Sequence, residues 1–382
     1  MLPERSLASA LVCSRTGTTA SLDDPQFLSP TGAPWLVDYD LSEVDGSELA
    51  ARWRQRPWSM WRYRELLPHR RDEDRVDLGE GGTPLIRLRR TVPREIEVLL
   101  KEESGNPTGS FKARGLAMAV HRARELGAPG VELASAGNAG LALAAYAAAH
   151  GLPARVALPE DAPAKIIARC RYHGASVLTA GGTLLEAARR LADFDDGYWN
   201  ISTLKEPYRV EGKKTMGLEL AEQLGWGLPD WIFYPTGGGT GIVGMQRAFD
   251  QLEELGLISG RRPRFVAVQM AGCAPIVRAF ERGDDVAETW AEPNTRVWGL
   301  RVPKAIGDFI ILSALRDTDG LAISVKEDEV GPIAERIACE EGMLIGPEGA
   351  ACLVALERLI ASKIIAPGDR VVVFQTGHPA NY

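Results

Sequence analysis

The sequence lacks long apolar runs and has few cysteines. No stretch reaches the roughly 18 consecutive apolar residues of a membrane-spanning helix, so we expect none. The apolar patch at residues 7–12 is interrupted by Ser9, and it is too short and too weak for a signal peptide. The five cysteines are scattered and odd in number, which excludes a disulfide framework and fits a reducing compartment. We therefore expect a cytoplasmic protein.

An excess of positive charge is also missing. The formal net charge is −7, which argues against a nucleic acid or an anionic membrane as the partner. Arginines crowd residues 52–75, but acidic residues alternate with them, a pattern that predicts a solvated, salt-bridging surface. The sequence shows no internal repeat and no low-complexity segment. With 382 residues, of which 45% are hydrophobic, the chain can bury a sizeable core in one large or two ordinary domains.

From about residue 83 onward, short apolar runs alternate with amphipathic helical stretches. Strands are expected at 96–101, 131–134, 155–158, 176–179, 231–234, 265–269 and 370–374. Helices are expected at 113–126, 140–150, 162–172, 184–194, 213–224, 242–255, 307–315, 330–341 and 350–361. Buried strands alternating with helices predict parallel sheets covered by helices on both faces, and two such sheets would suit this length.

Three loops that each connect a strand to a helix carry the residues of chemical interest, because ligands bind at such loops in open α/β sheets. The first loop, residues 106–115, places Lys112 at a helix start behind small hydroxyl residues. The positive end of the helix dipole lowers the cost of deprotonating a lysine, and a neutral amine is what Schiff-base chemistry needs. An ordinary surface lysine in the first turn remains an alternative.

Two weaker signals come from polar residues at other strand ends. The second loop, residues 134–140, contains Ser135 and Asn138, which could bind a carboxylate or a ring hydroxyl. A plain helix N-cap is the alternative for this loop. Thr376 directly follows the last expected strand, where its hydroxyl could hydrogen-bond a neutral ring nitrogen.

The third loop, residues 235–241, is rich in glycine and precedes an expected helix. Consecutive glycines let backbone N–H groups approach an anion, and the helix N-terminus adds positive potential. The loop lacks the Gly-Lys-Ser/Thr ending of a P-loop and the spacing of a dinucleotide fingerprint. It therefore predicts a phosphate cradle of another kind, with a flexible connector as the alternative.

The order of these motifs resembles that of the fold-type II pyridoxal-phosphate enzymes, and within them that of the threonine synthases. The shared order is a lysine in a Ser-Phe-Lys-x-Arg-Gly setting, then Ser-x-Gly-Asn, a glycine-rich loop and a C-terminal Thr-Gly. The likeness runs from about residue 78 to residue 376 and includes the opening motif at 77–86. Residues 299–303 and 341–348 fit threonine-synthase-like members in particular.

The resemblance implies pyridoxal 5′-phosphate as the cofactor and gives each site residue a role. Lys112 would hold the cofactor as a Schiff base and shuttle protons, Asn138 would bind the ring hydroxyl, and Thr376 would face the pyridine nitrogen. The cofactor's phosphate is expected on the loop of Thr236, Gly237, Gly238, Gly239 and Thr240. The candidates for binding a phosphate group of the substrate are Arg209, Lys214, Ser135 and Thr108.

The sequence departs from the family pattern at three places. Many relatives have Asp after the Schiff-base lysine, where this chain has Ala113. The N-terminal stretch looks like a degenerate form of the short Cys-rich ribbon of some threonine synthases, with only Cys13 surviving. Since a structural zinc wants four ligands, we predict that no metal binds there. The segment 203–209 retains Arg209 but lacks the Asn-Ser pair often found just before it.

The resemblance implies two open, largely parallel α/β domains with the active site in the cleft between them. We expect an N-terminal extension at 1–75, a large cofactor-binding domain at 76–120 and 230–382, and a smaller domain at 121–229. The expected reaction converts O-phospho-L-homoserine and water into L-threonine and phosphate, in a homodimer acting on a small amino-acid substrate.

Two alternatives to this reaction stay open. One is a serine/threonine dehydratase or a β-replacement lyase, such as a cysteate synthase, on the same scaffold. The other is a non-catalytic sensor of an amino acid or of pyridoxal phosphate, against which the intact Lys112 and glycine loop argue.

Overall fold

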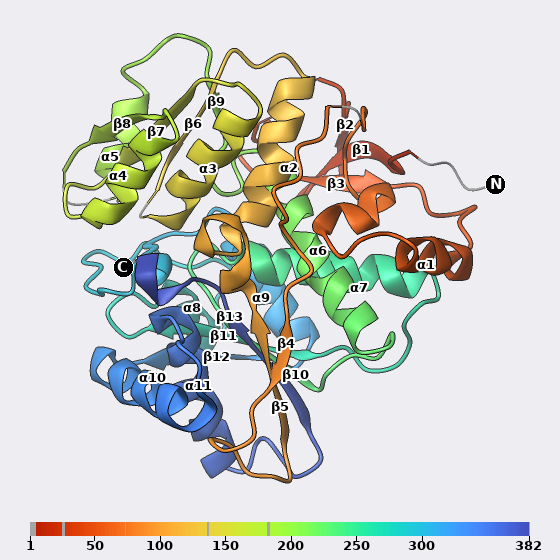
Figure 1. The fold of residues 1–382 in the computed structure, drawn as a ribbon, viewed down its shortest axis with the longest axis vertical. Coiled ribbons are helices and arrows are strands. Elements are labelled where there is room, and N and C mark those ends of the chain that lie inside the picture. The colour runs from red at the N-terminus through yellow and green to blue at the C-terminus, as the bar shows by residue number, and fades with distance from the viewer. Residues whose placement is uncertain (1–4, 25–26, 73, 136, 182–183, 382) are drawn as a thin grey trace.

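The computed structural model describes residues 5–24, 27–72, 74–135, 137–181 and 184–381. Figure 1 shows a larger parallel sheet in the lower half, a smaller parallel sheet at the upper left and an antiparallel N-terminal sheet at the upper right. The prediction of two open, largely parallel α/β units is confirmed. The residue boundaries of the domains remain a proposal. Helix α6 (Tyr208–Gln223), expected in the smaller domain, packs against both α2 (Lys112–Glu125) and α7 (Thr240–Glu254).

The larger sheet has the strand order β12-β11-β10-β13-β5-β4 and is parallel except for β4, which pairs antiparallel with β5. Its strands are β4 (Leu85–Arg87), β5 (Glu97–Glu102), β10 (Trp231–Pro235), β11 (Arg264–Met270), β12 (Leu321–Val325) and β13 (Arg370–Gln375). Its helices, besides α7, are α8 (Pro275–Arg282), α9 (Asp308–Asp317), α10 (Glu327–Glu341) and α11 (Pro347–Ala361).

Alternate residues of the central strands enter two separate hydrophobic cores, as the two-residue period of a strand requires. In β10, Ile232 and Tyr234 belong to the core that contains the apolar face of α7. Trp231 and Phe233 belong to the second core, which contains the apolar face of α11. Burial on both faces explains why β10 is a continuous apolar run that could be recognised from the sequence.

The smaller sheet has the order β8-β7-β6-β9 and is parallel throughout. Its strands are β6 (Val131–Ala134), β7 (Ala154–Leu158), β8 (Ser176–Thr179) and β9 (Trp199–Asn200). The helices that follow its strands are α3 (Asn138–Ala149), α4 (Ala164–Tyr172) and α5 (Leu184–Leu191). Helix α3 is rich in alanine, and its small side chains let it pack closely on β6 and β7.

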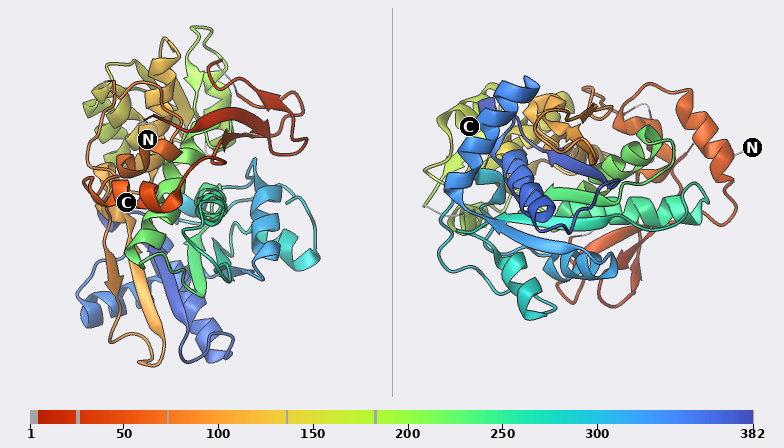
Figure 2. Two further views of the ribbon diagram at one scale, coloured as in Figure 1. Left: turned by 90° about the vertical axis from the view of Figure 1, so that its right-hand side faces the viewer. Right: turned by 90° about the horizontal axis from the view of Figure 1, so that it is seen from below.

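The N-terminal segment forms a three-stranded antiparallel sheet of β1 (Ala8–Cys13), β2 (Thr19–Ala20) and β3 (Trp35–Tyr39), followed by α1 (Gly46–Arg54). Figure 2 shows this sheet on the side of the molecule away from the smaller parallel sheet. The thiol of Cys13 lies 3.3 Å from Oγ of Ser29. No group of three potential metal ligands occurs among the described residues, and the prediction about zinc awaits a metal analysis.

The five cysteines are all unpaired in the structure. Within the described ranges, no helix combines the length and the apolar character that a membrane crossing needs. The predictions of a cytoplasmic location and a homodimer remain predictions.

Candidate active site

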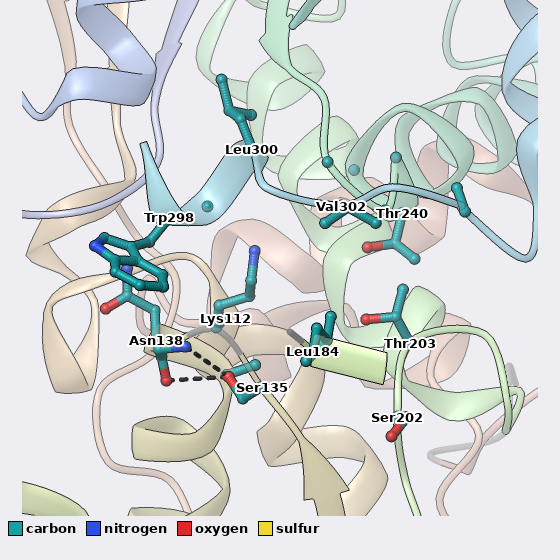
Figure 3. A pocket seen from close by; sticks show the side chains of 18 of the residues that line it. Lys112, Ser135, Asn138, Leu184, Ser202, Thr203, Thr240, Trp298, Leu300 and Val302 are labelled. Atoms are coloured by element: carbon teal, nitrogen blue, oxygen red, sulfur yellow. Dashed lines mark hydrogen bonds between the residues drawn. The ribbon is translucent and has the colours of Figure 1, made fainter. Parts of the chain in front are cut away.

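A cavity of about 470 Å³ lies where the carboxyl ends of strands from both parallel sheets face each other. The loops after β6 and β10 and the end of β13 line it, which is the position expected for a ligand in open α/β sheets. Figure 3 shows Lys112 in its centre, with Ser135 and Asn138 on one side and Thr240 on the other.

Lys112 begins helix α2, and hydrogen bonds to the end of β13 hold its loop in place. The amide of Phe111 donates to the carbonyl of Thr376 at 3.1 Å, and Ser110 forms an isolated bridge with Gly377. Burial is the main cause that lowers the pKa of Lys112 to about 7, and the nearby positive charge of Arg209 adds to it. At neutral pH a substantial fraction of this amine is therefore neutral and can act as a nucleophile.

The glycine-rich loop between β10 and α7 brings its backbone to the cavity wall. Gly239 precedes the first residue of α7 and has φ +67°, a left-handed conformation that favours glycine. A Cβ on Gly237 would lie only 2.5 Å from the carbonyl oxygen of Gly299. The structure thus leaves no space for a side chain at Gly237, Gly238 or Gly239, which line the cavity together with Thr240 at the N-terminus of α7.

Thr236, the first residue of the predicted phosphate loop, lies outside the cavity wall. Its amide donates to the carbonyl of Val268 at 2.8 Å, and its hydroxyl donates to the carbonyl of Tyr234 at 2.9 Å. Both of its donors are therefore used within the larger sheet, which leaves the four residues from Gly237 to Thr240 to face a ligand.

Ser135, Asn138 and Thr376 all line the cavity. Ser135 Oγ accepts hydrogen bonds from the amides of Gly137 at 2.9 Å and Gly140 at 3.0 Å, so it also caps the first turn of α3. Oδ1 of Asn138 accepts a hydrogen bond from Asn381 at 2.9 Å. Ala136, which completes the Ser-x-Gly-Asn motif, lies outside the described residues.

Of the four residues predicted to bind a phosphate group of the substrate, only Ser135 lines the cavity. Arg209 is buried, and its Nη1 donates to the carbonyl of Ile201 at 2.8 Å, just before Ser202 and Thr203 in the cavity wall. Among the described residues, no partner exists for Nε and Nη2 of this guanidinium. Burial lowers the pKa of Arg209 to about 10 and raises that of Glu206, whose carboxylate accepts from the Arg209 amide, to about 7.

Lys214 and Thr108, like Arg209, are not among the residues that line the cavity. Nζ of Lys214 pairs with Glu211 at 2.5 Å and lies 3.8 Å from the ring centroid of Tyr39, so it faces the N-terminal sheet. Thr108 has φ +65°, and its carbonyl accepts a hydrogen bond from Asn381 at 3.1 Å.

A family model described as pyridoxal-phosphate dependent enzyme matches residues 76–377. The chain belongs to this family. It is 32% identical over 373 residues to the threonine synthase of Methanocaldococcus jannaschii, covering 96% of this chain and 91% of that protein. It is also 34% identical over 349 residues to the threonine synthase of Methanosarcina acetivorans, covering 90% of this chain and 84% of that protein.

Solved structures of other enzymes share the fold of this pyridoxal-phosphate-dependent lyase. An L-serine ammonia-lyase from Rhizomucor miehei superposes with a TM-score of 0.65 at 21% identity, covering 78% of this chain and 93% of that chain. The threonine deaminase of T.th. gives a TM-score of 0.62 at 27% identity, covering 78% of this chain and 92% of that chain. Because its sequence identity is only 21%, the likeness to the L-serine ammonia-lyase supports the fold alone.

The cavity of this pyridoxal-phosphate-dependent enzyme fits its cofactor. The glycine loop has no space for side chains at Gly237 and offers backbone N–H groups and the N-terminus of α7 to a phosphate. Lys112 supplies an amine of lowered pKa for the aldehyde. The individual roles predicted for Asn138 and Thr376 remain proposals.

Several charged residues of the cavity wall were not assigned from the sequence, among them Lys213 and Glu348. Lys213 lies four residues after Arg209, so the two side chains share a face of α6, whereas Lys214 points about 100° away. The helix was expected to start at residue 213, which hid this spacing. Glu348, at the start of α11, accepts a hydrogen bond from the amide of Gly299 at 3.2 Å.

Proposed function

We propose that this enzyme converts O-phospho-L-homoserine and water into L-threonine and phosphate. The observation that carries the proposal is the buried guanidinium of Arg209, which has N–H donors without a partner among the described residues. A buried cation with free donors is suited to a phosphate group, and the neighbouring cavity holds the amine of Lys112. The relatives that match most of the chain carry the name threonine synthase, which supports the same reaction.

In the proposed reaction, Lys112 moves protons and Arg209 holds the phosphate of the substrate. Pyridoxal phosphate, when bound, supplies the electron sink that makes the α-proton of an amino acid removable. Lys112 takes the proton from Cα and moves protons in the later steps. Loss of a proton from Cβ then drives phosphate out from Cγ, which takes up a proton to become the methyl group. The hydroxyl of a water molecule adds at Cβ, Cα regains its proton, and the other proton of the water leaves with the phosphate. Arg209 holds the phosphate of the substrate while it leaves.

The remaining residues would hold the cofactor and tune its ring. The backbone from Gly237 to Thr240 binds its phosphate, and Asn138 orients its ring through the hydroxyl. Thr376 faces the pyridine nitrogen with a neutral hydroxyl. A hydroxyl at this position leaves the nitrogen unprotonated and makes the ring a more restrained electron sink than a carboxylate would.

The test is a steady-state screen of the holoenzyme in which phosphate release and ammonia release are measured in parallel. We expect phosphate and threonine in equal amounts from O-phosphohomoserine, and little ammonia from serine or threonine. Lys112→Ala serves as the control for turnover that does not use the site. Fast ammonia release from threonine without phosphate release from O-phosphohomoserine would refute the proposal.

A dehydratase is the second candidate, and the likeness to the threonine deaminase at 27% identity favours it. A dehydratase has no need of a phosphate-binding cation beyond the cofactor site. The parallel screen separates the two reactions directly. Absence of turnover with every amino acid, together with tight binding of one of them, would point to the non-catalytic sensor.

A further inference from the structure

Lys213 is a buried lysine in the cavity wall that has no role in the proposed reaction. It is 1% exposed. Its Nζ donates a hydrogen bond to Oγ1 of Thr240 and lies 5.1 Å from the ring centroid of Phe111. The side chain therefore runs from α6 to the first residue of α7, directly after the glycine loop.

Lys213 differs from the other deeply buried lysines in its ion pairing. Lys101 and Lys214 are equally buried, and each has a carboxylate at 2.5 Å, from Glu219 and Glu211 respectively. In the part of the chain that the structure describes, no carboxylate lies within ion-pair distance of Lys213. Burying a charged ammonium without a counter-ion costs several kcal/mol, so this position is suited to an anion that the protein itself does not supply.

The surroundings of Lys213 show where such an anion would sit. Thr240, its hydrogen-bond partner, is the last residue of the loop whose backbone lines the cavity from Gly237 onward. The N-terminus of α7 adds positive potential at the same point. The ammonium and the glycine loop therefore converge on one place in the cavity.

We propose that Lys213 binds the phosphate group of pyridoxal phosphate as a fixed cation and completes the cradle formed by the glycine loop. This proposal rests on the assignment of the cofactor's phosphate to that loop, and it does not depend on which amino acid the enzyme converts. The affinity for the cofactor would then depend on the charge of Lys213 as well as on the backbone amides of the glycine loop.

The charge state of Lys213 is expected to change when the phosphate binds. Burial is the main cause that lowers its pKa well below the ordinary value, and the positive charges of Arg209 and Lys112 add to this effect, while the carboxyl of Glu206 opposes it. A phosphate dianion beside the amine opposes both causes and raises the pKa again. Binding of the phosphorylated cofactor and protonation of Lys213 are therefore coupled.

The experiment compares two ligands that differ only in the phosphate. Apoenzyme is titrated with pyridoxal phosphate and with pyridoxal, and binding is followed by absorbance. We expect Lys213→Met to lower the affinity for pyridoxal phosphate by roughly ten- to a hundredfold, the range for one lost charge-assisted hydrogen bond, and the affinity for pyridoxal by less than about threefold. Lys205→Met, which removes a lysine elsewhere in the cavity wall, should leave the ratio of the two affinities unchanged.

An unchanged affinity ratio in Lys213→Met would overturn the proposal. If the KM for O-phosphohomoserine is raised at the same time, Lys213 would instead bind the phosphate of the substrate. If Lys213→Met fails to fold, as judged by circular dichroism, Lys213→Gln decides by the same ratio, because it keeps a donor for Thr240 without the charge. An enzyme that proves not to be a threonine synthase would still give the expected ratio, since neither titration uses an amino acid.

Discussion

Replacing Arg209 with methionine tests the proposed phosphate site of the substrate most directly. Methionine replaces the aliphatic part of the side chain and removes the guanidinium whose Nε and Nη2 lack partners among the described residues. Each charge-assisted hydrogen bond contributes about 1.5–3 kcal/mol, and part of the loss is recovered by the remaining donors of the cavity. We therefore expect kcat/KM for O-phosphohomoserine to fall by about 2–4 kcal/mol of transition-state binding, roughly 30- to 800-fold.

The substitution also affects the folded protein, and this effect must be measured separately. The carbonyl of Ile201 loses its 2.8 Å hydrogen bond, which costs about 1–3 kcal/mol of stability. The carboxyl of Glu206, whose pKa burial raises to about 7, loses the positive charge that opposes this shift. Its pKa rises further, so a larger fraction of this carboxyl is protonated at neutral pH. Thermal unfolding of the holoenzyme reports these changes.

The assay follows phosphate release from O-phosphohomoserine and ammonia release from serine or threonine in the same preparation. Any slow deamination should change much less than phosphate release, because these substrates carry no phosphate. Arg209→Lys keeps the charge without the planar fork and should recover part of the loss. Equal losses with phosphorylated and unphosphorylated substrates, or a loss below about threefold, would show that Arg209 does not bind the substrate's phosphate.

Further predictions concern Lys112, the glycine loop and the N-terminal sheet. Borohydride reduction and peptide mapping should label Lys112 alone, and Lys112→Ala should lose both the label and the yellow colour; a label on another lysine would contradict the assignment. With a pKa of about 7, Lys112 should capture the cofactor faster as pH rises from 6 and level off by about pH 8, whereas an ordinary amine would keep gaining up to pH 10. Gly237→Ala forces a Cβ against a carbonyl oxygen 2.5 Å away and should weaken cofactor binding by about 1–3 kcal/mol, while Gly331→Ala, which meets nothing within 4 Å, should not. Metal analysis should find no zinc bound at Cys13, and one zinc per chain would refute this.

The elements that the sequence predicted well are those buried on both faces. The strand expected at 231–234 is a continuous apolar run because β10 lies between two hydrophobic cores. Strand β12 (Leu321–Val325) was not expected, since it is an edge strand with partly exposed residues that resembles a loop. Helix α8 (Pro275–Arg282) is only two turns long, too short for its period to stand out.

The site could be predicted in outline because its residues follow strand ends, which sequence patterns locate. Details that depend on side-chain direction could not be predicted. Thr236 and Gly237 are neighbours in the sequence, yet only Gly237 lines the cavity. From the sequence alone, Lys213 and Lys214 are equally good candidates for a lysine that faces the cavity. Only the observed start of α6 shows that Lys213 shares a helix face with Arg209.

The position of β13 in the larger sheet sets an order in which the enzyme can mature during synthesis. This strand follows the other strands of its sheet in sequence, but it lies between β10 and β5, and the residue after it accepts a hydrogen bond from the amide of Phe111. The smaller sheet comes from the continuous segment 131–200 and can form while the rest is still being translated. The larger sheet, in contrast, can be completed only after β13 has been synthesised, because this strand joins β10 to β5. The loop that carries Lys112 is therefore held in place only once β13 has joined the sheet, and removal of this strand should abolish cofactor binding.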